Sequence, residues 1–382
     1  MKVSYYCQHV LGVGHLHRSL EICRALGKRF QVEMILGGPE SNLDAPGVQF
    51  HQLPGLRMDR TFSGLETCDP AASLETVKAQ RQQQLLDHIT QNRPDIVVLE
   101  LYPFGRKQFR FELDPLLEWL SSDSPHTLIY CSLRDILVEK SEGQDKFETR
   151  AVHTFNRFFD GLLVHADPQI VTIDETFTKS DQLKPEIFYT GFVTPHPSPQ
   201  RANEIRRITG TNQQKKLIVA SIGSGSVGEE LLFSVAQVHA LLSEEGVVTQ
   251  IFTGPYLDQA DFNRLKTMTS DSLRIDRFTP HFIDWLLAAD LSISMAGYNT
   301  TMNVLAARTP ALMLPFAQNR EQQMRLERLV PLSGISPLTR EQLEPTQLHE
   351  IIEQRLNDER YKSEVNLDGA ENTRDYLIKK LR

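Results

Sequence analysis

A histidine and a glutamate are the residues of this sequence best suited to chemistry. His15 follows the glycine loop at 12–14 and begins a predicted helix, and Glu100 ends the apolar run at 95–100. An imidazole titrates near neutral pH and can take a proton from a hydroxyl. A carboxylate at the end of a strand can orient such a base or bond an acceptor hydroxyl. His15 has an equally good structural interpretation, in which it caps its own helix or bonds a loop carbonyl.

A second candidate site lies within the stretch 291–323, LSISMAGYNTTMNVLAARTPALMLPFAQNREQQ. Its first five residues form an apolar run that is typical of a buried strand, and Gly297 follows that run. Asn299 and Thr300 can cap the next helix, which is predicted to run to about Arg308. The sequence therefore predicts a strand–helix–strand unit of a parallel sheet.

The turn of this unit should lie at the carboxyl edge of the sheet, where open α/β sheets bind ligands. A helix N-terminus at that edge offers N–H groups and positive partial charge, which suit a diphosphate. Gln322 and Gln323 follow the second strand and are expected to add amide contacts from a neighbouring loop.

A second glycine loop, Gly223-Ser224-Gly225-Ser226, follows a predicted strand at 216–221. Each glycine loop alone is a weak signal, because tight strand–helix turns often need glycine for steric reasons. Neither loop matches the full dinucleotide-binding fingerprint, and neither continues into Gly-Lys-Ser/Thr, which excludes kinases and ATPases of the Walker type. Two domains with such loops would make a cleft.

The segment 99–111 alternates basic and aromatic residues, with Arg106 among the basic ones. Such a pattern can bind an anionic acceptor or rest on a membrane surface through Phe104 to Phe111. The alternative is a helix start with solvated charges and buried rings. Arg134, next to Asp135, is a second candidate acceptor contact, although an ion pair that shapes the cleft is the interpretation we favour.

Composition and charge restrict the class of protein. The chain has 382 residues, which predicts two domains, and a formal net charge of −8, which argues against a general nucleic-acid binder. Its four cysteines show no metal-ligand spacing, and no Asp-x-Asp or other metal motif appears. We expect no bound metal, no signal peptide, no membrane span and a cytoplasmic location, with peripheral contact at the inner membrane face as an addition.

The order of predicted elements indicates an α/β fold of two doubly wound, Rossmann-like domains facing a central cleft. Apolar runs predict strands in the first half at 2–8, 31–36, 48–53, 95–100, 127–131, 161–165 and 187–189. In the second half they predict strands at 216–221, 249–253, 273–278, 291–295 and 311–316. The proline-rich segment before residue 201 is the expected linker. The predicted domains are 1–192, a linker at 193–200, 201–358, and a C-terminal helix at 359–382 that packs toward the first domain.

Three segments of the sequence resemble glycosyltransferases of the GT-B fold. They are GVGHLHRSLEICRAL near the start, IGSGSVG at 222–228, and DWLLAADLSISMAGYNTTMNVLAARTPALMLPFAQNREQQ at 284–323. The nearest group is family 28, typified by MurG, the peptidoglycan N-acetylglucosaminyltransferase. Within it, PFGR at 103–106 and SLRD at 132–135 resemble a branch of predicted bacterial glycosyltransferases.

This resemblance implies inverting, metal-independent sugar transfer from a UDP-sugar, with the acceptor in the N-terminal domain and most of the donor in the C-terminal one. His15 would match the histidine of the family's N-terminal glycine loop. Residues 223–225 would lie near the diphosphate, 278–279 near the uracil, 297–300 near the phosphates and 322–323 near the donor sugar. By position, the donor-binding residues would be Gly14, Gly223, Ser224, Gly225, Phe278, Thr279, Gly297, Asn299, Thr300, Asn303, Gln322 and Gln323.

One departure from the family pattern concerns the donor. The family usually has a glutamate on the central helix that bonds both ribose hydroxyls, whereas this sequence has Asn303 there. An amide can bond a hydroxyl but carries no charge. The N-terminal glycine loop is also shorter than that of the peptidoglycan enzyme, so its lipid acceptor is not carried over.

The sequence therefore predicts a glycosyltransferase that moves a sugar from a UDP-sugar, or another nucleoside-diphosphate sugar, to a small-molecule or lipid-linked hydroxyl. His15 and Glu100 are its predicted catalytic residues, Arg106 and Arg134 its acceptor contacts, and no cofactor is expected, because the UDP-sugar donor is a substrate. Two alternatives remain open: a nucleotide-sugar hydrolase of the same fold, and a non-catalytic nucleotide-sugar-binding subunit.

Overall fold

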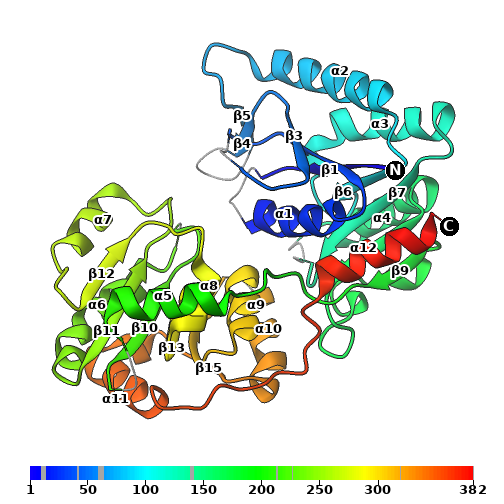
Figure 1. The fold of residues 1–382 in the computed structure, drawn as a ribbon. Coiled ribbons are helices and arrows are strands. Elements are labelled where there is room, and N and C mark those ends of the chain that lie inside the picture. Colours follow the sequence, from blue (N-terminus) through cyan, green and yellow to red (C-terminus); the bar gives the residue numbers. More distant parts are fainter. Residues whose placement is uncertain are drawn as a thin grey trace. The chain divides into compact units, whose positions relative to one another are not determined.

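The computed structural model describes residues 1–9, 14–40, 43–58, 64–137, 142–211, 214–225, 227–318 and 320–381. Residues 12 and 13 of the first glycine loop and Ser226 of the second lie outside the described residues. The chain divides into two compact units: unit 1 comprises Met1–Val193 and Asn366–Arg382, and unit 2 comprises Thr194–Val365. Figure 1 shows helices on both faces of a sheet in each unit.

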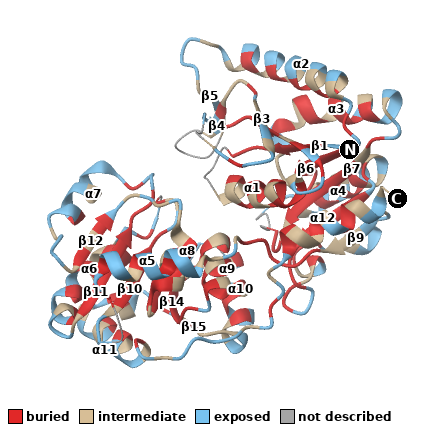
Figure 2. Ribbon diagram, viewed as in Figure 1, coloured by how far each residue is buried: buried red, intermediate tan, exposed pale blue. Residues whose placement is uncertain are grey.

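Unit 1 contains a seven-stranded parallel sheet in the order β3-β2-β1-β6-β7-β8-β9. These strands carry the apolar runs, and their residues are mostly buried (Figure 2). The bounds are β1 (Lys2–Cys7), β2 (Gln31–Leu36), β3 (Val48–Gln52), β6 (Ile96–Glu100), β7 (Leu128–Arg134), β8 (Gly161–His165) and β9 (Glu186–Tyr189). A separate antiparallel hairpin is formed by β4 (Leu56–Met58) and β5 (Leu65–Thr67).

The helices that cover this sheet are α1 (Gly14–Gly27), α2 (Leu74–Asn92), α3 (Arg110–Asp123), α4 (Gln144–Phe158) and α12 (Gly369–Lys380), with short 3₁₀ helices at Lys107–Phe109, Ile173–Glu175 and Ser180–Gln182. Ser73 caps α2 by accepting a hydrogen bond from the Thr76 N–H group. A fully buried ion pair between Arg81 and Glu112 joins α2 to α3, with 2.6 Å between Arg81 Nη2 and Glu112 Oε1.

Unit 2 contains a six-stranded parallel sheet in the order β12-β11-β10-β13-β14-β15. Its strands are β10 (Lys216–Ser221), β11 (Val247–Phe252), β12 (Leu273–Asp276), β13 (Leu291–Met295), β14 (Ala311–Leu314) and β15 (Ile335–Pro337). Its helices are α5 (Pro199–Thr209), α6 (Glu229–Glu244), α7 (Gln259–Lys266), α8 (Phe282–Ala288), α9 (Tyr298–Ala307), α10 (Arg320–Leu329) and α11 (Pro345–Arg355), with 3₁₀ turns at Val330–Leu332 and Glu341–Leu343. Helix α5 begins within the expected linker, because Ser198 caps it and Pro199 occupies its first turn.

Each sheet has one point at which the strand order reverses. In unit 1, β1 pairs with β2 on one side and with β6 on the other. In unit 2, β10 pairs with β11 on one side and with β13 on the other. Chains that leave β1 and β6, or β10 and β13, diverge there, and the carboxyl edge at such a point is where open α/β sheets bind ligands.

Candidate active site

Glu100 is the centre of the charged group at the reversal point of unit 1. It is the last residue of β6, and its side chain is completely buried. Its Oε1 atom accepts hydrogen bonds from His15 Nδ1 (2.6 Å) and Arg18 Nη2 (2.9 Å). Its Oε2 atom accepts from Arg106 through Nε (3.1 Å) and Nη2 (2.9 Å). Both oxygens are therefore engaged, which fits the orienting role predicted for Glu100 better than direct contact with an acceptor.

These contacts keep the Glu100 carboxylate ionised. Burial alone would raise the pKa of Glu100, but the interactions with His15, Arg106 and Arg18 outweigh burial and hold that pKa well below its usual range. A buried carboxylate that accepts two charged donors is stable only while both remain in place.

The carboxylate also fixes the tautomer of His15. Nδ1 lies 2.6 Å from Glu100 Oε1 and 3.2 Å from Arg18 Nη2. Because the carboxylate is the nearer partner and can only accept, we place the imidazole proton on Nδ1, and Nε2 carries the lone pair. Burial lowers the pKa of His15 to about 4, with the charges of Arg106 and Arg18 acting in the same direction and Glu100 opposing them. The His15 side chain keeps 22% of its surface exposed. His15 is therefore a neutral imidazole at pH 7 that can accept a proton at Nε2.

The backbone after Glu100 is held in an unusual conformation. Leu101 and Arg106 both have positive φ angles, of 66° and 56°. Non-glycine residues rarely adopt this region, and each such residue costs on the order of 1–3 kcal/mol. The turn that returns the Arg106 side chain to Glu100 therefore persists against local strain.

Arg18 is the member of this group that sequence reasoning did not assign. It lies three residues after His15 on α1, and residues at this spacing share one helix face. The three-residue spacing between His15 and Arg18 is the sequence feature that could have indicated that the two side chains lie together. Arg106, predicted as an acceptor contact, has Glu100 as its partner instead, and an acceptor role for it stays a prediction. Arg134, at the end of β7, forms an ion pair with Asp135 at 3.7 Å.

The expectation of a membrane contact through 104–111 is not supported. The ring of Phe104 packs against Phe155 and Phe177, and Phe109 is also buried. Two of the three aromatic rings in this segment thus face the interior and offer no surface to a membrane. Within the described part of the chain, no helix is long and apolar enough to cross a bilayer.

In unit 2, Gly297 lies between β13 and α9 and is the N-cap residue of that helix. The expectation that Asn299 and Thr300 cap the helix is wrong, because α9 begins at Tyr298 and both residues lie in its first turn. Gly297 has a φ of −66°, which any residue can adopt, and a Cβ atom placed on it would meet no described atom within 4 Å. Neither backbone strain nor packing therefore requires a glycine here, whereas close approach of a ligand to the helix N-terminus would.

The glycine loop after β10 is shaped by its neighbours. Gly223 and Gly225 have positive φ angles of 69° and 93°. A Cβ on Gly225 would lie 2.6 Å from the Thr253 oxygen, so this glycine is required by packing, whereas one on Gly223 would meet no described atom within 4 Å. Ser224 accepts a hydrogen bond from the Tyr256 N–H group through its backbone oxygen (2.9 Å), which ties the loop to the turn after β11.

The remaining predicted donor residues follow strands of the same sheet. Phe278 and Thr279 follow β12, and the Phe278 side chain is 55% exposed. Asn303 lies on α9, where its Oδ1 atom accepts a hydrogen bond from Thr194 (2.8 Å).

The two glutamines lie on helix α10 and not in the loop that the sequence suggested. Gln322 accepts a hydrogen bond from the Phe316 N–H group (3.0 Å), and Gln323 donates one to Glu327 (3.0 Å). Gln322 therefore holds the backbone that follows β14.

The chain is similar in sequence to known glycosyltransferases. Residues 219–380 match the family model described as the glycosyltransferase family 28 C-terminal domain. A Methanosarcina mazei protein named an uncharacterized glycosyltransferase is 22% identical over 402 residues, which cover 96% of each chain.

Two solved structures resemble the whole chain. MurG from Acinetobacter baumannii superposes with a TM-score of 0.58 at 12% identity, covering 99% of both chains. UDP-GlcNAc 2-epimerase from Methanocaldococcus jannaschii superposes with a TM-score of 0.61 at 11% identity, covering 100% of both. At such low identity these two likenesses concern the fold. Together with the family match, they confirm the predicted GT-B fold of two Rossmann-like domains and the resemblance to family 28. The predicted central cleft stays a prediction.

Proposed function

We infer that this chain, a family 28-like glycosyltransferase of the GT-B fold, transfers a sugar from a nucleoside-diphosphate sugar to a hydroxyl acceptor with inversion and without a catalytic metal. UDP-sugars are the donors to test first. The observation that carries the proposal is the buried Glu100 carboxylate, which orients His15 at 2.6 Å and leaves its Nε2 atom as a base. This proposal places the acceptor hydroxyl at His15 and the donor diphosphate at Gly297.

In the proposed reaction, the acceptor hydroxyl donates its proton to His15 Nε2 while its oxygen attacks the anomeric carbon. The bond between that carbon and the diphosphate oxygen breaks, and the nucleoside diphosphate leaves with the electron pair. Attack opposite the leaving group inverts the anomeric configuration. The imidazolium formed on His15 is stabilised by the ionised Glu100, so this pair fits a base whose positive charge appears only during the reaction.

We assign stabilisation of the negative charge on the leaving diphosphate to unit 2. A diphosphate carries negative charge that helix N-termini and backbone N–H groups can stabilise without a metal. The open position at Gly297 supports such an approach to α9, and Phe278, which is exposed, would lie near the nucleobase chiefly through backbone groups. His15 and Glu100 belong to neither group of three metal-ligating side chains found among the described residues.

The proposal is tested by incubating the protein with UDP-, GDP-, dTDP- and CMP-sugars and a panel of hydroxyl acceptors. A thermal-shift screen identifies the donor first, because a ligand that binds only the folded protein raises its melting temperature. We expect transfer that survives excess EDTA and NMR spectra that show an inverted anomeric centre. A retained configuration, or turnover that requires an added divalent ion, would contradict the proposal. Release of free sugar in the absence of any acceptor would indicate the nucleotide-sugar hydrolase instead.

A further inference from the structure

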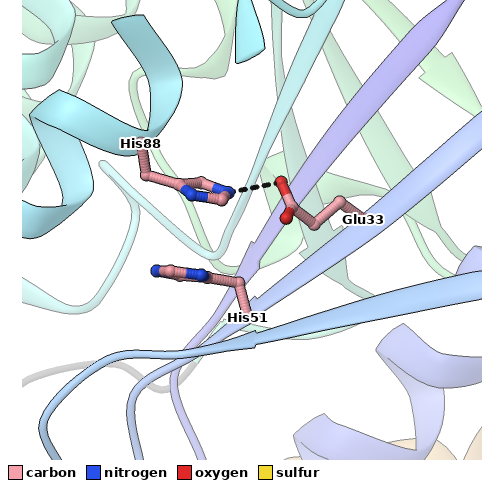
Figure 3. A group of neighbouring side chains, drawn as sticks. All are labelled: Glu33, His51 and His88. Atoms are coloured by element: carbon pink, nitrogen blue, oxygen red, sulfur yellow. Dashed lines mark hydrogen bonds and ion pairs between the residues drawn. The ribbon is translucent and has the colours of Figure 1, made fainter. Parts of the chain in front are cut away.

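A cluster of polar side chains between α2 and the edge of the unit 1 sheet is not explained by sugar transfer. Glu33 on β2, His51 on β3 and His88 on α2 bring ligand atoms within 4.8 Å of one another. Figure 3 shows the His88 ring above the His51 ring, with its nitrogen directed at the Glu33 carboxylate. The two rings stack with their centroids 3.7 Å apart. All three side chains are half-buried.

The fold brings these residues together from sequence positions far apart. Ile35 is the register partner of His51, and Glu33 lies two residues before Ile35, so Glu33 and His51 project from the same face of the sheet. His88 and Asn92 are four residues apart on α2 and therefore lie on one face of that helix. Helix and sheet thus present four polar side chains to one another.

The hydrogen bonds in this cluster conflict with one another when the Asn92 amide nitrogen faces His88. Glu33 Oε2 lies 2.6 Å from His88 Nε2 and 3.2 Å from Asn92 Nδ2, and Asn92 Nδ2 lies 2.8 Å from His88 Nε2. If His88 Nε2 carries a proton, that proton faces the Asn92 amide hydrogens. If it carries none, its lone pair faces the Glu33 carboxylate. Turning the Asn92 amide over gives a proton on His88 Nε2 two acceptors, and when that proton is absent it makes the amide oxygen a third acceptor directed at the same point.

Three acceptors that converge on one point are the arrangement that a cation requires. The three distances, 2.6, 2.8 and 3.2 Å, are shorter than the separations of about 3.3–3.6 Å between neighbouring ligands of a tetrahedral Zn²⁺ ion bound at about 2.0–2.2 Å, so an ion entering here would move these atoms apart by up to about 1 Å. His51 Nε2 is buried and has no hydrogen-bond partner, so no hydrogen bond at that atom opposes rotation of this ring toward an ion. Imidazole and carboxylate ligands together suit Zn²⁺, Ni²⁺ or Cu²⁺ and do not suit Mg²⁺ or Ca²⁺.

We propose that Glu33, His51 and His88, with the Asn92 amide oxygen, form a binding site for a divalent transition-metal ion, Zn²⁺ in the first instance. The ion would join α2 to β2 and β3. Glu33 lies within β2, whereas His15 and Glu100 lie at the carboxyl edge between β1 and β6. The site is therefore structural, and it is independent of the function proposed above.

The second metal-ligating group of the described residues supplies a matched control. In the group Glu245, His349 and Glu353, the two carboxylates are exposed. His349 Nε2 faces Glu245 at 3.2 Å and Nδ1 faces Glu353 at 3.6 Å, so each nitrogen has its own carboxylate and a doubly protonated ring satisfies both. We expect this group to bind Zn²⁺ much more weakly.

The test is titration of the full-length, EDTA-treated protein with ZnCl₂, followed by calorimetry and by the melting temperature. We expect one tight site per chain and a higher melting temperature on binding. His88→Gln and Glu33→Gln should each weaken binding at least about 100-fold, since even outer-shell partners of a metal contribute about 10–100-fold. His349→Gln and Cys68→Ser should leave the tight site unchanged. The absorption spectrum of the Co²⁺-loaded protein should change on His51→Asn, which reports ligation even if a variant is less stable.

Two results would overturn the proposal. One is Zn²⁺ affinity that His88→Gln and Glu33→Gln leave unchanged, and the other is the absence of a tight site in the wild-type protein. Sugar transfer below the melting temperature should be the same with and without Zn²⁺, so loss of the metal site and loss of the proposed transfer activity are measured separately.

Discussion

The two reversal points of this molecule are built from opposite kinds of chemistry. In unit 1 the reversal point between β1 and β6 holds an ionised carboxylate, two guanidinium groups and an imidazole, all fixed by side-chain hydrogen bonds. In unit 2 the reversal point between β10 and β13 holds glycines and the N-terminus of α9. In the proposed reaction, one unit would move a proton with charged side chains, whereas the other would stabilise negative charge with its backbone.

The substitution with the largest expected effect tests the charged side chains at the reversal point of unit 1. His15→Ala removes the base, and we expect kcat to fall about 10²–10⁴-fold, which is the usual contribution of a positioned general base. The donor dissociation constant should change little, because donor binding is assigned to unit 2. Steady-state kinetics with calorimetry of donor binding measures both. His153→Ala on the exposed face of α4 is the matched control and should have no effect. Full activity of His15→Ala would remove the proposed base from the mechanism.

A second substitution separates the orientation of His15 by Glu100 from proton transfer to His15. Glu100→Gln keeps the shape of the side chain but removes the charge that fixes the His15 tautomer and opposes Arg18 and Arg106. We expect kcat to fall roughly a hundredfold while the KM for the donor stays within a factor of about two. The melting temperature should be recorded alongside, with Glu118→Gln, which breaks only an exposed ion pair, as the control. Unchanged kcat in a folded Glu100→Gln protein would show that His15 does not depend on this carboxylate.

A pair of glycine substitutions tests whether the backbone of unit 2 binds the donor phosphates. Gly297→Ala introduces no strain and no clash, so stability should change by less than about 0.5 kcal/mol. The methyl group should hinder a phosphate from approaching the N-terminus of α9. Loss of one hydrogen bond to a charged group costs about 1.5–3 kcal/mol, so we expect the donor affinity to fall about tenfold or more.

Gly225→Ala should instead lower the stability of the protein. The Gly225 φ of 93° and the close Thr253 oxygen predict a loss of about 1–3 kcal/mol of stability. Chemical denaturation and donor titration of both variants measure the contrast. Equal donor affinity of Gly297→Ala and the wild type would mean that no phosphate approaches this position.

Much of the fold could be predicted from the sequence, because buried parallel strands are continuous apolar runs such as those at β6, β10 and β13. His15 and Glu100 were predicted because one follows the first strand and the other ends an apolar strand. Their contact could not be predicted, since it depends on β1 and β6 being neighbours. The capping error at Asn299 has a local cause: Gly297 takes the extended N-cap conformation two residues earlier. Gln322 was misplaced because α10 begins at Arg320, sooner after β14 than the loop pattern suggested.

The smallest expected effect is a difference in pH dependence between the two halves. Protonation of an ordinary histidine with a pKa near 6.5 would reduce kcat/KM about fourfold between pH 8 and pH 6. The pKa of His15 is about 4, so its neutral form is fully populated above pH 5 and kcat/KM should stay flat down to that pH before falling. The donor dissociation constant should be flat over the same range. A fall in kcat/KM centred near pH 6.5 would contradict the assignment.

The central claim is that His15 is a neutral base whose proton is held on Nδ1 by Glu100. Long-range ¹H–¹⁵N NMR of the imidazole, assigned with a His15→Gln variant, observes this directly. At pH 7 the account predicts a protonated Nδ1 and an unprotonated Nε2, with titration only near pH 4. An imidazolium at pH 7, or the tautomer with its proton on Nε2, would contradict it.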